Sequence, residues 1–202
     1  MKMHKENLKN FYNKDAKYRE LSPKQDWKIR VRDDFCNLLS KKAKQSLLEI
    51  GAGTGHDSQY FMEKGLQVVA IDLSPEMVKK CKEKSIEAYE MDFYDLTPLG
   101  RKFDCIWAMN TLLHVPKAEL PQVLSQIDSV LEDGGLFYMG VYGGVDSEHE
   151  YALKEVSDTP RFFSFYLLED LLAVLEGHFH IISSQEILMD NDTFQSIIMQ
   201  KH

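Results

Sequence analysis

The first residues that point to chemistry lie in the stretch SLLEIGAGTGHDS, residues 46–58. Gly51, Gly53 and Gly55 follow a short apolar run that carries one acid, Glu49. Glycines let a backbone take positive φ and let a ligand approach without meeting a Cβ. The backbone N–H groups of a helix that starts after such a turn are unpaired and face the crevice above it. The pattern therefore predicts a ligand site over the glycine turn.

The spacing of the glycines bears on which ligand binds. Dinucleotide sites use G-x-G-x-x-G with a pyrophosphate on the helix N-terminus. Here the spacing is G-x-G-x-G, and His56 occupies the position of the third dinucleotide glycine. Glu49 would repel a pyrophosphate and attract a cation such as an ammonium or a sulfonium. A nicotinamide oxidoreductase is therefore disfavoured.

Two further acids end predicted strands. Asp72 closes VVAID, where a carboxylate can accept both hydrogen bonds of a ribose diol, although it can also serve the start of the next helix. Asp92 and Phe93 follow the run at 86–91 and can contact an adenine amino group and stack on its ring, with Asp95 as a rival acid and a core position as the alternative for Phe93. Three acids at these positions favour a positively charged nucleoside as the ligand.

The elements that position these acids alternate along the chain. Short apolar runs lie at 46–51, 67–73, 86–91, 103–109 and 135–142, and helical stretches lie between them at 57–64, 75–84 and 117–131. This alternation predicts an α/β protein whose mainly parallel sheet carries helices on both faces. Ser74-Pro75 reads as a helix start, and Gly134-Gly135 is predicted to end the helix before the fifth strand.

The two ends of the chain differ from this core. Residues 5–20 have loose helical spacing, the breaker pair Ser22-Pro23 follows, and an amphipathic helix is predicted from Asp26 to about Lys44. After a helix at about 167–176, HIISSQEIL and TFQSIIMQK are joined by the turn-forming MDNDT. A link this short forces the two strands to pair antiparallel.

At this point the sequence resembles the class I S-adenosylmethionine-dependent methyltransferases. LLEIGAGTG looks like their first motif, VVAIDLSPEMV like their second and MDFYDL like their adenine-site motif, and the segment from FDCIWAMNTLLHVP to LEDGGLFYMGVY is similar to their fourth and fifth segments. The resemblance covers about residues 46–143. It implies a Rossmann-like, seven-stranded, mainly parallel sheet with an antiparallel C-terminal hairpin.

The resemblance also implies an organisation and a cofactor. One methyltransferase domain is expected over residues 1–202, with N-terminal helices forming a lid at 1–45, a cofactor-binding core at 46–143, and a substrate loop and terminal hairpin at 144–202. The cofactor would be S-adenosyl-L-methionine, with S-adenosyl-L-homocysteine as product. The residues implied to hold it are Tyr12, Glu49, Gly51, Ala52, Gly53, Gly55, Asp72, Leu73, Met77, Asp92, Phe93 and Asn110.

Methyl transfer from a sulfonium is an in-line displacement in which positioning and desolvation supply much of the rate. His114 is the candidate general base, or else a histidine that shapes the pocket. The residues predicted to contact the acceptor are Tyr18, His114, Tyr142, Arg161 and Phe163, although an aromatic cluster with one arginine is also typical of ordinary core. No metal is predicted. NTLL matches the Asn/Asp-Pro-Pro-aromatic motif of nucleobase and glutamine methylases only at Asn110.

Composition narrows the partners. The chain has 202 residues and a formal net charge of -8, so nucleic acid is not expected as a partner. Three scattered cysteines and the absence of a long apolar run predict a cytoplasmic protein without a membrane segment, acting as a monomer or homodimer. A small-molecule acceptor is the leading expectation. A non-catalytic cofactor-binding module or partner subunit, and a methyltransferase of protein or RNA, remain as alternatives.

Overall fold

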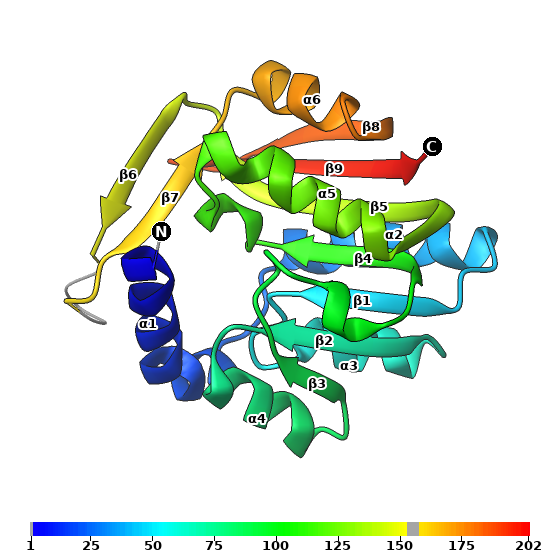
Figure 1. The fold of residues 1–202 in the computed structure, drawn as a ribbon, viewed down its shortest axis with the longest axis horizontal. Coiled ribbons are helices and arrows are strands. Elements are labelled where there is room, and N and C mark those ends of the chain that lie inside the picture. The colour runs from blue at the N-terminus through cyan, green and yellow to red at the C-terminus, as the bar shows by residue number, and fades with distance from the viewer. Residues whose placement is uncertain (1, 153–157) are drawn as a thin grey trace.

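The apolar runs of the sequence form a central sheet in the order β3-β2-β1-β4-β5-β9-β8 (Figure 1). The computed structural model describes residues 2–152 and 158–202. The strands are β1 (Ser46–Ile50), β2 (Gln67–Asp72), β3 (Glu87–Glu90), β4 (Phe103–Met109), β5 (Leu131–Gly143), β8 (Phe179–Leu188) and β9 (Thr193–Lys201). Only β9, which pairs with both β5 and β8, runs against the others in this sheet. The predicted mainly parallel sheet with an antiparallel C-terminal hairpin is therefore confirmed.

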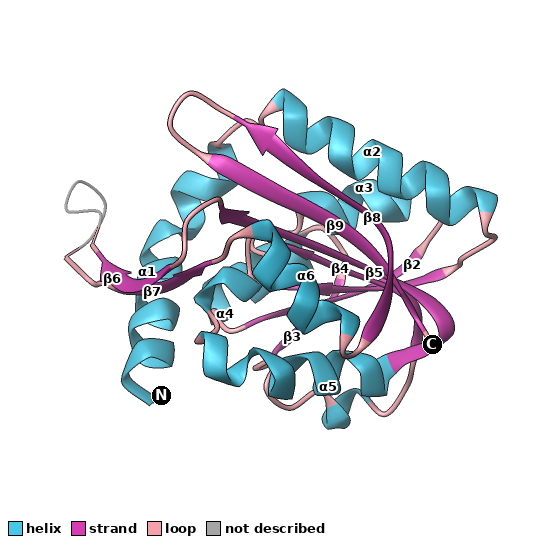
Figure 2. Cartoon of the chain, turned by 90° about the horizontal axis from the view of Figure 1, so that it is seen from above, coloured by secondary structure: helices cyan, strands magenta, loops and turns pink. Residues whose placement is uncertain are grey.

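Helices cover both faces of the sheet (Figure 2). On one face lie α2 (Asp26–Lys41) and α3 (His56–Glu63), and on the other lie α5 (Leu120–Val130) and α6 (Leu168–Glu176). Because side chains alternate along a strand, Leu47 packs with α2 and α3 while its neighbour Leu48 belongs to the cluster under α5 and α6. The helix α4 (Pro75–Glu83) packs on Ala70 and Ala88 beside this core. Its predicted cap is confirmed, since the Ser74 hydroxyl accepts from the Met77 N–H.

The prediction that Gly134-Gly135 ends a helix is wrong. The helix α5 ends at Val130, and both glycines lie inside β5. Leu131 pairs with Phe103 and Leu136 with Cys105, so the residues between Leu131 and Leu136 bulge from the ladder. A Cβ on Gly135 would lie 2.7 Å from a methyl carbon of Leu131. The glycines therefore allow a close approach at a strand bulge, a role that a Gly-Gly pair also signals in sequence.

The helix α1 (Lys2–Leu21) lies across the carboxyl ends of β2 and β3, next to the arrowheads of the parallel strands in Figure 1. Polar pairs tie it to the sheet end, with Lys5 Nζ 2.7 Å from Asp92 Oδ2 and the Ser74 hydroxyl 2.6 Å from Asn13 Oδ1. At its C-terminal end Glu20 accepts from Lys84 Nζ at 2.8 Å. These contacts support α1 as the lid that residues 1–45 were predicted to provide.

A second small sheet was not predicted. The strands β6 (Ser147–Tyr151) and β7 (Arg161–Phe165) pair antiparallel in the segment expected to be a substrate loop, of which residues 153–157 lie outside the described residues. Three short 3₁₀ helices complete the described elements, namely η1 (Thr97–Leu99), η2 (Leu112–His114) and η3 (Lys117–Glu119). The hairpin β6–β7 contacts the lid through Arg161, whose guanidinium lies 4.0 Å from the centre of the Phe11 ring.

Two further predictions concern membrane-spanning segments and the cysteines. No helix of the described residues has the length and apolar character that crossing a membrane requires. The three cysteines, Cys36, Cys81 and Cys105, are buried and unpaired. Cys105 packs in the middle of β4, as a small apolar side chain would.

A buried acid joins three of these elements. Asp57, in the first turn of α3, accepts hydrogen bonds from Lys24, from Arg32 Nη1 at 3.2 Å and from the Trp107 indole N–H at 3.3 Å. It is 5% exposed. The carboxylate thus connects the segment before α2, the helix α2 itself and the central strand β4.

Replacing Asp57 with Asn is expected to destabilise the fold, because Lys24 and Arg32 then remain partly buried without their carboxylate. The free energy of unfolding should fall by roughly 3 kcal/mol, the lower end of the cost of breaking a buried pair, since both cations keep access to water. Urea unfolding followed by circular dichroism measures it. Asp34→Asn, which changes an exposed acid on the same helix as Arg32, is the control and should change the value by less than about 0.5 kcal/mol. Equal losses in both variants would contradict the role of Asp57.

Candidate functional site

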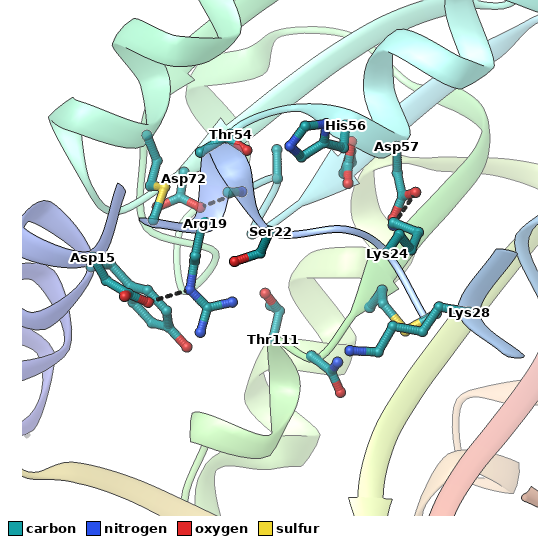
Figure 3. Close-up of a pocket in the computed structure, with 18 of the residues that line it drawn as sticks. Asp15, Arg19, Ser22, Lys24, Lys28, Thr54, His56, Asp57, Asp72 and Thr111 are labelled. Atoms are coloured by element: carbon teal, nitrogen blue, oxygen red, sulfur yellow. Dashed lines mark hydrogen bonds and ion pairs between the residues drawn. The ribbon is translucent and has the colours of Figure 1, made fainter. Parts of the chain in front are cut away.

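A cavity of about 820 Å³ opens at the carboxyl ends of β1, β2 and β4, beneath α1 and the start of α2 (Figure 3). Strand order reverses at this position, because β1 lies between β2 on one side and β4 on the other. Open α/β sheets bind ligands at such a reversal. Most of the predicted cofactor residues line it: Tyr12, Glu49, Gly51, Ala52, Gly53, Asp72, Leu73, Met77, Phe93 and Asn110.

The glycine turn forms the floor of the cavity. Gly51 has φ +70°, and a Cβ there would lie 1.6 Å from the Thr111 hydroxyl oxygen, so no side chain fits. Gly53 has φ +56° and no atom within 4 Å of the position of a Cβ, so its backbone faces open space. Gly55 does not line the cavity. It starts α3, where a Cβ would meet Ile86 and Cys81.

Asp72 connects the end of β2 to the glycine turn. One of its carboxylate oxygens accepts from the Gly53 N–H at 2.8 Å, and the other accepts from the Ser74 N–H at 2.9 Å. Burial raises the pKa of Asp72 to about 6, against the effect of these two hydrogen bonds and of Arg19. The carboxylate lines the cavity, where it can still accept from a ligand hydroxyl.

Glu49 lies deeper, at the end of β1, and is 4% exposed. The Ser58 hydroxyl donates to its Oε2. Burial, and then the nearby Asp57 carboxylate, raise the pKa of Glu49 well above its ordinary value. A cation placed beside it would be stabilised strongly, because the buried acid has no cation within ion-pair distance among the described residues.

The predicted adenine residues divide between two cavities. Asp92 lines a small adjoining cavity, where it accepts from Lys5 Nζ and from the Tyr94 N–H at 3.0 Å. Phe93 and Leu73 line both cavities and so lie at their junction. A planar ring at this junction would contact both side chains.

His114 is held by two contacts that define its protonation. Its Nδ1 lies 2.8 Å from the Phe162 carbonyl oxygen, which can only accept, so Nδ1 carries the hydrogen. Its Nε2 lies 2.9 Å from the Tyr12 hydroxyl and accepts from it. Burial, aided by Arg161 and Arg19, lowers the pKa of His114 to about 3. The imidazole is therefore neutral, and this geometry favours a role in positioning Tyr12 over one as general base.

The predicted acceptor residues lie apart. Tyr18 and His114 line the large cavity, whereas Tyr142, Arg161 and Phe163 do not. The Arg161 guanidinium lies between the rings of Phe11 and Phe163 and is 6% exposed. Tyr142 packs edge-on against Phe194. Residues 161–165 form the β7 strand, and Arg161 of this strand contacts Phe11 of α1.

Several charged lining residues were not predicted. Asp15, Lys24, Lys28, Arg32 and Asp57 all face the large cavity, as does Arg19, which the N-terminal segment offers beside Tyr18. They come from α1, from the link between α1 and α2, and from the starts of α2 and α3. The breaker pair Ser22-Pro23 is the only sequence signal here, since it folds α2 back toward the strand ends. No residue spacing marks the cations themselves.

Metal-binding side chains do not gather in this region. Within residues 2–152 and 158–202, no three His, Cys, Asp or Glu side chains lie close enough together to hold a metal ion. The expectation that the protein uses no metal stays a prediction.

Comparisons with known proteins agree with the fold. A family model described as a methyltransferase domain matches residues 47–135. An uncharacterized methyltransferase of Alkaliphilus oremlandii is 28% identical over 69% of this chain and 64% of its own length. The malonyl-[acyl-carrier protein] O-methyltransferase of Hamiltonella defensa is 31% identical over 63% of this chain and 50% of its own length. The chain thus spans between half and two thirds of these relatives.

Solved structures extend the likeness to the whole chain. The structure of a DhpI–SAH complex superposes with a TM-score of 0.79 at 19% identity, covering 100% of this chain and 98% of that one. The match includes the lid and the terminal hairpin, which lie outside the residues that the family model matches. The chain therefore has the Rossmann-like fold of the S-adenosylmethionine-dependent methyltransferases, and residues 47–135 match a methyltransferase domain.

Proposed function

We propose that the protein binds S-adenosylmethionine in the large cavity and transfers its methyl group to an oxygen or nitrogen of a small molecule. The observation that carries this proposal is the cavity at the strand reversal, with a buried Glu49 and an accessible Asp72 on either side of a glycine turn that faces open space. The bound SAH of the DhpI structure and the O-methyltransferase relative support the cofactor and the reaction class.

The residues of the cavity fit the parts of this cofactor. Asp72 would accept the ribose hydroxyls, and Leu73 and Phe93 would flank the adenine. The ammonium would lie toward Glu49 and toward Asn110, whose side-chain oxygen is buried and has no hydrogen-bond partner. When bound, S-adenosylmethionine supplies a methyl group on a positively charged sulfur. The lid helix α1 would exclude water from the cavity during transfer.

The residues of the cavity are better suited to positioning the two ligands than to transferring a proton. His114 is neutral and engaged with Tyr12, so the imidazole holds the tyrosine in place and has little capacity to accept a proton from an acceptor. Positioning and exclusion of water can supply much of the rate for an activated methyl group. Catalysis would then rest on the fit of two ligands beneath α1.

Replacing Asp72 tests the cofactor site. Asp72→Asn should weaken binding of S-adenosylhomocysteine by about 10–100-fold, the equivalent of one or two hydrogen bonds to a charged acceptor. Isothermal titration calorimetry measures the Kd. The control is Asp95→Asn, whose carboxylate accepts from Thr97 and lines neither cavity. An unchanged Kd in Asp72→Asn, with its circular dichroism spectrum intact, would remove Asp72 from the ligand site.

A second prediction follows from the raised pKa of Glu49. The ligand ammonium should lower that pKa, so the complex holds fewer protons than the free protein and affinity rises with pH between about pH 6 and pH 7.5. Calorimetry at neutral pH in buffers of different ionisation enthalpy should show release of a fraction of one proton.

Two controls separate Glu49 from other groups. 5′-Methylthioadenosine lacks the ammonium but keeps the ribose, so its binding should release fewer protons than that of S-adenosylhomocysteine. Glu49→Gln removes the titrating group and should abolish the difference between the two ligands. Equal proton release by both ligands in the unsubstituted protein would show that the ammonium does not lie beside Glu49.

A further inference from the structure

The cavity is lined by cations as well as by acids. S-adenosylmethionine combines a sulfonium, an ammonium and one carboxylate, so it is a net cation. The lining includes Arg19, Lys24, Lys28 and Arg32 on one side of the same space. Lys24 and Arg32 share the Asp57 carboxylate, which leaves Arg19 and Lys28 as the cations with capacity to bind a ligand.

Lys28, in the first half of α2, is the less neutralised of the two. No carboxylate of the described residues lies within ion-pair distance of its Nζ, and its one close partner is the Trp27 ring, 5.1 Å away. Burial, with Lys24 and Arg19 nearby, lowers its pKa to about 8. A desolvated ammonium surrounded by other cations is stabilised when an anion binds beside it.

Arg19, near the end of α1, has an acidic partner for only one part of its guanidinium. Its Nε donates to Asp15 Oδ2 at 2.6 Å, and no described residue accepts from its two Nη groups. Figure 3 shows the guanidinium beside Thr111, with the Lys28 ammonium on the other side of Thr111, so both point into the middle of the cavity. The Nη pair of an arginine matches the two oxygens of a carboxylate or phosphate.

The state of His114 leads to the same conclusion by another route. An alcohol or ammonium acceptor must lose a proton before or during methylation, and the histidine of this site is neutral, buried and engaged with Tyr12. An oxyanion has already lost its proton at neutral pH. Such an acceptor needs no general base.

Resting on the function proposed above, we propose that the methyl acceptor is an oxyanion, a carboxylate or a phosphate or phosphonate group, held between Arg19 and Lys28. In the reaction a lone pair of the oxyanion forms the new O–CH₃ bond while the S–CH₃ bond breaks, and its electrons stay on sulfur. The sulfonium becomes a neutral thioether, the acceptor becomes a methyl ester, and no proton moves. Arg19 and Lys28 orient the anion and leave one oxygen lone pair free for attack.

The test supplies S-adenosylmethionine with a labelled methyl group and a panel of small carboxylic acids, phosphonic acids and phosphate monoesters. Each acid is paired with its neutral amide or ester of matched shape. Transfer to acids but not to the neutral partners is the expected result. Mild alkaline treatment identifies the source of the oxyanion, because carboxylic methyl esters release labelled methanol, whereas methyl phosphodiesters and monomethyl phosphonates do not.

Variants test the two cations. Arg19→Gln and Lys28→Met should each raise the KM for the acid by about 10–100-fold, the loss expected for one charge-assisted contact. Their Kd for S-adenosylhomocysteine should stay within a factor of about three of the unsubstituted value. Arg30→Gln is the matched control, because Arg30 is exposed on the same helix as Lys28 and lies outside the cavity. Arg19→Lys should restore part of the affinity for the acid.

The alternative outcomes overturn the inference in distinguishable ways. Transfer only to neutral alcohols or amines, or to no acid of the panel, contradicts an oxyanion acceptor. Loss of S-adenosylhomocysteine binding in Arg19→Gln or Lys28→Met, with 5′-methylthioadenosine binding unchanged, would assign these cations to the cofactor carboxylate. If the folded unsubstituted protein binds neither adenosyl ligand, the proposed function itself fails and the inference fails with it.

The lowered pKa of Lys28 predicts how the KM for the acid depends on pH. The charged groups that face Lys28 are Lys24, Arg19 and Asp57. Lys28 is cationic below its pKa and neutral above it, so the KM for the acid should rise as the pH increases through about 8. Initial rates against acid concentration measure it. Lys28→Arg keeps its charge and should flatten this rise, and an unchanged profile in that variant would exclude Lys28.

Discussion

The contact between Gly51 and Thr111 is the constraint on which the rest of the site depends. The end of β1 and the residues after β4 approach so closely that only a hydrogen fits on the Gly51 Cα. This approach is possible because β1 and β4 are neighbours although two strands and two helices separate them in the chain. The chain runs outward from β1 through β2 to β3 and then returns to β4 on the other side of β1, and the space above this reversal becomes the cavity.

Besides Asp15 and Asp57, which pair with nearby cations, the charged groups of this cavity come from two kinds of element. The carboxylates of Glu49 and Asp72 come from strand ends, whereas Arg19 and Lys28 come from the two N-terminal helices. A cationic nucleoside and an anionic second ligand would each meet the side that attracts it. The same burial and positive charge keep His114 neutral, because Arg19 and Arg161 both disfavour the imidazolium. A pocket built for an anion is thereby a poor place for a histidine base.

The sequence predicts the sheet and most of the strand-end residues that line the cavity, because both depend on local signals. Alternating or continuous apolar runs predict the strands, and Gly51 and Asp72 lie where two of those strands end. The cationic side depends on how α1 and α2 fold over the sheet, and no spacing in the sequence encodes that contact. Sequence signals can also be ambiguous or absent. A glycine pair such as Gly134-Gly135 is found in strand bulges as well as at helix ends. The strand SEHEY, which begins at Ser147, is polar and has no apolar pattern that would predict it.

Polar pairs at the rim of the lid, such as Lys5 with Asp92 and Glu20 with Lys84, join α1 to the core, in addition to the buried Phe11 and Ala16. Such pairs are individually weak and can be exchanged without repacking a hydrophobic interior. The nucleoside half of the cavity belongs to the sheet, and the cationic half belongs to the lid and the helix after it. Evolution can therefore alter the choice of acceptor by changing residues 1–45 while the cofactor half stays the same, so proteins with this core can diversify one half of their chemistry at a time.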